Sequence, residues 1–230
     1  MSSGPALRYC WLVAVVLALF PVAGPLAQEK RLEPVDEAGR DPSWVSFRNQ
    51  LLNAVETRDR KYIMSILAPD VRTSLTAPRG AAEFRKQWDV DGENSPLWPA
   101  LRSALLLGSA YVEREKGRRE LCAPYLLAKW PPDLDPFLNG VAITRDVLVK
   151  AEPSSRSATL QVLSYDVAAV SDWEVPDKAP EAKQRWVKVK VKNGEGYVPE
   201  EQIRSPVEHA ACFVRTEAGW RMTGLAPGGG

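Results

Sequence analysis

The sequence contains a single histidine, His209, among its 230 residues. A Ser-His-Asp or Cys-His catalytic site would depend on this one residue, and a histidine-based zinc site would lack its further ligands. No two cysteines are spaced as Cys-x-x-Cys, so the usual signal of a redox or cysteine-zinc motif is also missing. His209 follows Glu208 in SPVEHAACF, and a lone histidine beside a glutamate is typically a surface or partly buried residue. No cofactor and no metal are expected.

The chain also lacks an excess of either charge. Its 30 lysine and arginine residues stand against 29 aspartate and glutamate residues, so the formal net charge is +1. Nucleic-acid binding needs a concentrated positive field, and a nucleic-acid partner is therefore not expected. The hydrophobic share of 45% and the charged share of 26% are ordinary for a globular protein. The length suits one large domain or two small ones.

A long apolar run, YCWLVAVVLALF, stands near the N-terminus directly after Arg8. This pattern predicts a signal peptide over residues 1–27, with cleavage after Ala27. The alternative is an uncleaved N-terminal anchor, although the prolines that follow the run disfavour a membrane-spanning helix. Both interpretations place the rest of the chain in the periplasm or outside the cell. Membrane contact is expected only through an uncleaved N-terminal segment.

Hydrophobic periodicity divides the rest of the chain. Residues 28–42 are polar, with proline and glycine, and are expected to form a flexible leader. Residues 43–136 carry apolar side chains at helical spacing. Over 137–206 the period changes to two, and Asn193-Gly194 gives a strong hairpin signal, so short strands of a small barrel or sandwich are predicted there. A hairpin over 207–226 and a disordered tail over 227–230 complete the chain.

Two cysteines, Cys122 and Cys212, remain after the predicted signal peptide. In an oxidising compartment such a pair is a natural disulfide, and closing so long a loop would stabilise the fold by about 4 kcal/mol. Two buried thiols are the alternative, and the residues alone leave both open.

From Val141 to about Pro206 the chain resembles a bacterial SH3 domain, a small barrel of five to six strands. The resemblance rests on an opening strand with a Pro-Ser turn, and on a closing pattern of Trp, alternating Val, a Gly turn and Gly-Tyr-Val. These stand here as Val147, Val149, Pro153, Ser154, Trp186, Val187, Val189, Gly194, Gly196, Tyr197 and Val198. The resemblance implies an α+β protein with a mainly helical N-terminal region and a C-terminal SH3-like small β-barrel.

The chain as a whole also resembles secreted proteobacterial SH3-domain proteins of unknown function. It shares with them the steps Pro-Asp-Val-Arg at 69–72, Ala-Pro-Tyr at 123–125 and Gly-Trp-Arg-Met-Thr at 219–223. The N-terminal region with the last hairpin is further similar to a cone-shaped α+β fold of the nuclear-transport-factor type. That likeness implies that the barrel is inserted before the last hairpin, which would let Cys212 approach Cys122.

Two sets of residues are candidates for chemistry or binding. Carboxylates cluster in WDVDGEN and PPDLDP, but acids so close in polar stretches are typical of solvated turns. Aromatic side chains on one side of an SH3-like barrel can form a groove for extended peptides or sugars, whereas the same side chains turned inward are core. The candidates for this groove are Trp186, Tyr197, Trp173 and Tyr165.

The sequence therefore predicts a non-enzymatic binding or scaffold protein of the cell envelope. The resemblance and the compartment suggest a cell-wall glycopeptide or an envelope protein as the partner. The alternative is a small-molecule-binding or weakly catalytic pocket in the N-terminal region, lined by Asp, Tyr or Arg side chains.

Overall fold

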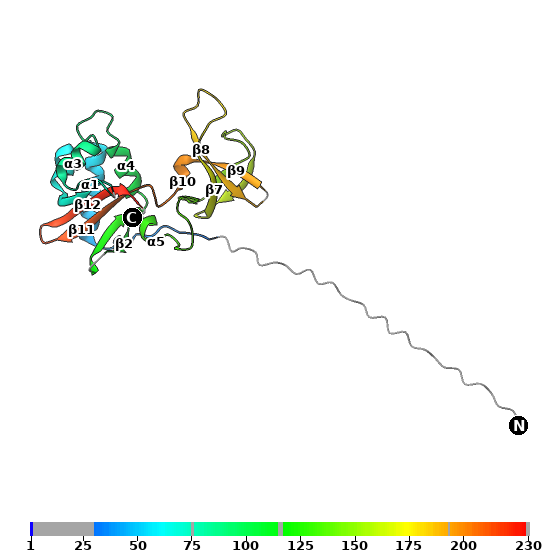
Figure 1. Cartoon of the computed structure of the whole chain (residues 1–230), viewed down its shortest axis with the longest axis horizontal. Coiled ribbons are helices and arrows are strands. Elements are labelled where there is room, and N and C mark those ends of the chain that lie inside the picture. Colours follow the sequence, from blue (N-terminus) through cyan, green and yellow to red (C-terminus); the bar gives the residue numbers. More distant parts are fainter. Residues whose placement is uncertain (2–29, 75, 115–116, 193, 229–230) are drawn as a thin grey trace.

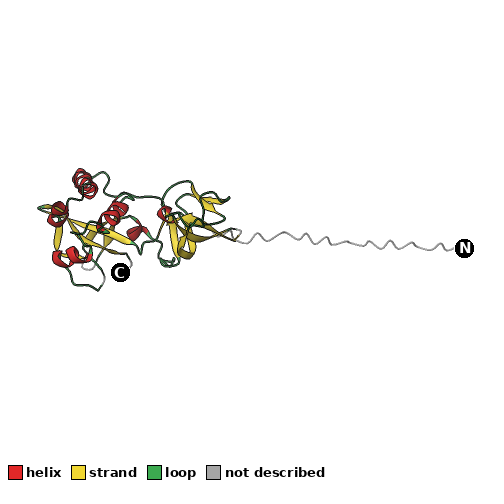
Figure 2. Ribbon diagram, turned by 90° about the horizontal axis from the view of Figure 1, so that it is seen from above, coloured by secondary structure: helices red, strands yellow, loops and turns green. Residues whose placement is uncertain are grey.

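A computed structural model describes Met1 and residues 30–228, except for residues 75, 115–116 and 193. The predicted signal peptide lies outside the described residues. The described chain forms two units, each built on its own sheet (Figure 1). We call residues 42–136 together with 207–228 the outer unit, and residues 137–206 the inserted unit. The protein is thus of mixed α+β type, and the helices gather in the outer unit (Figure 2).

The outer unit packs helices against one face of a five-stranded sheet. Its strand order is β1-β12-β11-β3-β2, and β1 pairs with β12 in parallel while the other pairs are antiparallel. The last hairpin, β11 and β12, therefore lies in the middle of the sheet formed by the first half of the chain. The elements are α1 (Pro42–Glu56), α2 (Arg60–Ser65), β1 (Leu67–Arg72), α3 (Ala81–Gln87), α4 (Leu97–Leu105), β2 (Ala110–Glu113), β3 (Arg119–Ala123), α5 (Leu126–Lys129), β11 (His209–Thr216) and β12 (Gly219–Pro227).

Local signals define where α1 begins and what it covers. Asp41 is its N-cap and accepts a hydrogen bond from the backbone N–H of Ser43 (2.9 Å), and Pro42 occupies the first helical position. Hydrogen bonds from the hydroxyl and backbone N–H of Ser43 hold the pKa of Asp41 below its usual value. The buried face of α1 centres on Trp44, whose ring lies 5.1 Å from that of Phe213 on β11.

The inserted unit is a seven-stranded sheet with the order β10-β4-β7-β8-β9-β5-β6. The order ends at β10 and β6, so the sheet is open rather than a closed barrel among the residues that the structure describes. Its core is made of small aliphatic side chains such as Val149, Val187 and Val198. The elements are β4 (Asn139–Ala142), β5 (Val147–Lys150), β6 (Thr159–Leu163), β7 (Val167–Pro176), β8 (Arg185–Val191), β9 (Gly194–Pro199), the 3₁₀ helix η2 (Glu200–Gln202) and β10 (Ile203–Arg204).

The expected flexible leader is packed against the protein over 30–41. Arg31 forms a β-bridge with Asp166 of the inserted unit, and Ala38 is buried. The leader passes so close to Gly108 that a Cβ there would lie 2.3 Å from the carbonyl oxygen of Val35, and Gly108 has a φ of +74°. Backbone pairing of this kind leaves no hydrophobic pattern in the sequence, so these contacts could not be predicted from it.

The predicted tail is also ordered in part. Pro227 belongs to β12, and the backbone N–H of Gly228 donates to the carbonyl of Glu208 (2.9 Å). Residues 229–230 lie outside the described part, as does Asn193 of the predicted turn. Gly194, which pairs with Val191 where β8 and β9 meet, has a φ of +131°, a value that favours glycine. Among the residues described, no helix is both long and apolar enough to cross a membrane.

The two chain segments that connect the units are tied together by polar contacts. The hydroxyl of Ser205 donates to the carbonyl of Pro136, so the outgoing and returning segments touch. Arg204 is only 4% exposed, and its guanidinium donates to the hydroxyl of Ser103 on α4 and to the carbonyl of His209 (2.7 Å). Its Nε also lies 3.5 Å from a carboxylate oxygen of Glu208. The side chain of Arg204 therefore links the inserted unit to the outer unit.

Candidate functional site

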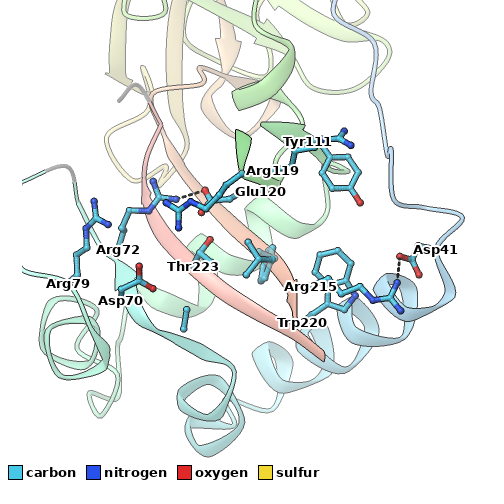
Figure 3. A pocket seen from close by; sticks show the side chains of 14 residues that line it. Asp41, Asp70, Arg72, Arg79, Tyr111, Arg119, Glu120, Arg215, Trp220 and Thr223 are labelled. Carbon is cyan, nitrogen blue, oxygen red and sulfur yellow. Dashed lines mark hydrogen bonds and ion pairs between the residues drawn. The ribbon is translucent and has the colours of Figure 1, made fainter. Parts of the chain in front are cut away.

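A cavity of about 540 Å³ lies beside the sheet of the outer unit (Figure 3). Residues from β1, β2, β3, β11 and β12 line it, and the start of α1 borders it through Asp41. Neighbouring residues on a strand point to opposite faces of a sheet. Leu121 and Phe213 belong to the helix-covered core, so Glu120 and Val214 face the other side. The cavity is lined from both sides of the sheet, because Phe213 and Trp220 border it as well.

Arginine is the dominant side chain around this cavity. Five arginines line it together with three carboxylates, which gives the lining a formal charge of +2 in a chain that is nearly neutral overall. The arginines come from stretches of the chain that are far apart in the sequence. They are Arg72, Arg79, Arg118, Arg119 and Arg215, and the acids are Asp41, Asp70 and Glu120.

A buried carboxylate holds two arginines in place at one end of the cavity. Glu120 is 5% exposed, and its Oε2 accepts from Nη2 of Arg72 (2.5 Å) and from Nε of Arg114 (2.9 Å). Burial by itself would raise the pKa of Glu120. The charge of Arg72 and the hydrogen bond from Arg114 outweigh burial and lower that pKa below its usual value. Glu120 is thus ionised at neutral pH, and this cluster of three side chains carries a net positive charge.

The other arginines of the cavity differ in how they are engaged. Arg215 is paired loosely with Asp41 (3.5 Å), and Arg119 pairs with Glu113 (2.9 Å) while stacking over the ring of Tyr111 at 4.4 Å. Within the part of the chain that the structure describes, the guanidinium groups of Arg79 and Arg118 make no hydrogen bond or ion pair. Two cations at this cavity therefore have hydrogen-bond donors available for a ligand.

One grouping near the cavity has the residue types of a metal site. Glu120, Cys122 and Cys212 place their ligand atoms within 4.8 Å of one another. The two sulfur atoms, however, are joined in a disulfide between β3 and β11. Two guanidinium groups also bind the carboxylate of Glu120. The ligand atoms of this cluster therefore do not suit a metal cation.

The aromatic residues proposed as a groove from the sequence are dispersed. Trp186 is 1% exposed and its Nε1 donates to Asp177 (2.8 Å), so it is a core residue and not part of a binding surface. Tyr165 lies beside the leader, where its carbonyl accepts from the backbone N–H of Leu32. Tyr197 sits on β9 opposite Lys188 and Lys150.

Trp173 is the member of the predicted groove that borders a cavity. It lines a space of about 380 Å³ together with Phe137, Ile203 and Val207. Phe137 is 67% exposed, and its carbonyl accepts a hydrogen bond from Nε1 of Trp173 (3.3 Å). The predicted groove is thus reduced to one aromatic residue near the segments that connect the two units.

The carboxylate clusters and the histidine lie outside the arginine-lined cavity. Asp91 forms a two-bonded pair with Arg85, and Asp133 pairs with Lys30 at the surface. His209 packs edge-on against Trp88, with their ring centroids 4.9 Å apart. Burial, followed by the charge of Arg204, lowers the pKa of His209. His209 is exposed at the start of β11 and packs its ring against that of Trp88, which is consistent with a structural role.

The sequence predicts, as an alternative, an N-terminal pocket lined by Asp, Tyr or Arg side chains, but it does not indicate their positions. The signal was present in the dense charges of YVEREKGRRE, directly before a strand. It could not be told from an exposed charged loop, because only the strand order brings these residues beside Arg72 and Arg215. Comparison of the chain with protein-family models, with curated proteins and with solved structures finds no match.

Proposed function

We propose that this protein binds an anionic small molecule in the arginine-lined cavity of its outer unit. The observation that carries the proposal is the presence of Arg79 and Arg118 beside a cavity that already holds an excess of positive charge. A guanidinium presents several N–H donors in a plane and matches carboxylate and phosphate groups with two parallel hydrogen bonds. The volume of about 540 Å³ falls within the range of small-molecule sites.

The arrangement supports binding more directly than catalysis. Guanidinium groups stay protonated at all ordinary pH values, so they hold and orient a charged group but do not accept protons. Glu120, the buried acid of the site, is engaged by two arginines and its pKa is lowered, which makes it a poor general base. These features support a protein that captures its ligand.

Changing Arg118 to Gln is expected to weaken the binding of inorganic phosphate and of galacturonic acid by about tenfold, because one charged hydrogen-bond donor is lost. The measurement is an NMR chemical-shift titration at low ionic strength, which detects weak binding. Arg156→Gln is the matched control, since it removes the same charge from the inserted unit. Equal affinities in the two variants, or shifts spread evenly over the surface, would contradict the proposal.

A second candidate function rests on the inserted unit. Its strands carry the Trp and Gly-Tyr-Val pattern of a bacterial SH3 domain, and we propose that it is an SH3-like domain of a periplasmic or secreted protein. The cavity beside Trp173 and the exposed Phe137 favour a binding surface for a cell-wall glycopeptide or an envelope protein. This surface would tether the protein while the outer unit holds its ligand.

Purified peptidoglycan sacculi are expected to retain the protein, and Trp173→Ala is expected to reduce the retained fraction about tenfold because the ring is an aromatic contact in a cavity. Retention is measured by co-sedimentation. Leu160→Ala is the control, since Leu160 is a large apolar side chain, 51% exposed, on the same sheet. No sedimentation of the unaltered protein would remove the cell-wall partner from consideration.

A further inference from the structure

A second, smaller cavity adjoins the arginine-lined cavity. The second cavity has a volume of about 120 Å³ and shares Arg72 and Arg79 with the first. Arg114 and Ser74 line its sides, and Cys212 of the disulfide lies beside it. Because Arg72 and Arg79 border both spaces, the two cavities adjoin, and we call the pair of adjoining cavities the groove.

We infer that this groove accepts a linear ligand carrying two or more acidic groups, phosphoryl or carboxyl, spaced along a chain. One acidic group lies in the first cavity at Arg118, and the next lies in the second cavity at Arg114. The inference rests on the proposed function, since it specifies the ligand of the same site. The further claim is that a ligand with a single acidic group fills only part of this site.

The arginines between the two cavities retain donors for such a ligand. Arg72 uses Nη2 for Glu120, and Arg114 uses Nε for Glu120 while its Nη2 lies 3.9 Å from the sulfur of Cys212. A guanidinium has five N–H donors, so each side chain keeps several free. Glu120 sets the position of both groups and neutralises only one of their two charges.

The shape of the second cavity restricts what can enter it. Its volume of about 120 Å³ is small, and residues without bulky side chains form its β12 side, including Gly224 and Ala226. A Cβ at Gly224 would come within 3.6 Å of the side chain of Arg72, which shows how near the arginine lies to the backbone there. A single phosphoryl or carboxyl group suits this space, whereas a ring system does not.

Charge within the first cavity also orients the ligand. Asp70 on β1 lines the cavity, and its side chain makes no hydrogen bond or ion pair with other described residues. Its carboxylate disfavours an acidic group on the β1 side, so the ligand is expected along Arg118 and Arg119 on the β3 side. The chain of the ligand then crosses at Arg72 and Arg79 into the second cavity.

The test compares ligands of different length at constant ionic strength. Tripolyphosphate against inorganic phosphate, and trigalacturonate against galacturonic acid, are titrated by calorimetry or NMR into the unaltered protein. We expect at least one longer ligand to bind about 100-fold more tightly than its single-group counterpart, because further charged hydrogen bonds form. The series that shows this gain identifies the acidic group as phosphoryl or carboxyl.

Two variants locate the gain in the second cavity. Ala226→Glu places a negative charge there, and Ala226→Gln places a neutral side chain of the same size at the same position. For each variant, the affinity for the longer ligand is divided by the affinity for its single-group counterpart. This ratio is expected to be about tenfold lower for Ala226→Glu than for Ala226→Gln. Arg156→Gln in the inserted unit should keep the ratio of the unaltered protein.

The outcomes separate this inference from the proposed function. If single acidic groups bind at Arg118 but neither longer ligand gains affinity, the inference is overturned and the proposed function stands. A longer ligand could bind more tightly while Ala226→Glu and Ala226→Gln show the same ratio of long-ligand to short-ligand affinity. The ligand would then not extend into the second cavity, and the inference would likewise be overturned. If no ligand of either series binds, both fail.

Discussion

Replacing Cys122 and Cys212 together by alanine is expected to lower the free energy of unfolding by about 4 kcal/mol. The disulfide closes a loop with a sequence separation of 90 residues, and this loop contains the whole inserted unit. Without the bond, the unfolded chain regains the freedom of that loop. The bond also joins directly paired residues of β3 and β11, so the last hairpin is anchored where it meets the first half of the chain.

Urea denaturation of the variant and of the unaltered protein measures this effect. The unaltered protein in reducing buffer should unfold at the same urea concentration as the variant, which separates the loss of the bond from the loss of two sulfur atoms. The slope of the transition should be steeper for the variant, because its unfolded chain is less compact and exposes more surface. A variant as stable as the oxidised protein would show that strand pairing alone holds the hairpin in place.

Changing Arg204 to Met is expected to destabilise the protein by about 3 kcal/mol. Met has a similar length but no donors, so the hydroxyl of Ser103 and the carbonyl of His209 lose the hydrogen bonds that the buried guanidinium of Arg204 gives them. The carboxylate of Glu208 loses its neighbouring charge as well. The loss falls at the junction, so hydrogen exchange should quicken at β10 and at the start of β11 while β8 and β9 keep their protection.

Arg185→Met is the matched control for this prediction. Arg185 also pairs with a glutamate, Glu174, at 3.1 Å, but its side chain is 46% exposed. An exposed pair of this kind contributes only about 0–1 kcal/mol. Similar losses of stability in the two variants would mean that the buried contacts of Arg204 do not hold the units together.

The strongest local signals in the sequence predicted real elements. The helical spacing of apolar residues such as Trp44, Phe47 and Leu51 predicted a helix where α1 lies, and the alternation before Gly194 predicted a β8–β9 pair. These signals depend on neighbours within a few residues. The parallel pairing of β1 with β12 depends on residues more than 150 positions apart, such as Leu67 and Met222, and no local pattern carries that information.

The candidate site could not be predicted for a related reason. Trp186 begins an alternating strand, and alternation says that neighbouring residues face opposite sides without saying which side is buried. Its indole turned out to be core, bonded to Asp177. Arg72, Arg118 and Arg215 each read as an ordinary surface charge in the sequence. They become a site only when β1, β3 and β11 are placed in one sheet.

The strand order also has a consequence for the sequence of events during synthesis. Strands β11 and β12 leave the ribosome after the other strands that the structure describes, yet they lie between β1 and β3. Until they arrive, the apolar faces of α1 and α4 have no sheet to cover them, whereas every strand of the inserted unit is already present. The inserted unit can therefore fold first, and the outer unit remains in need of protection from aggregation until β11 and β12 have been made.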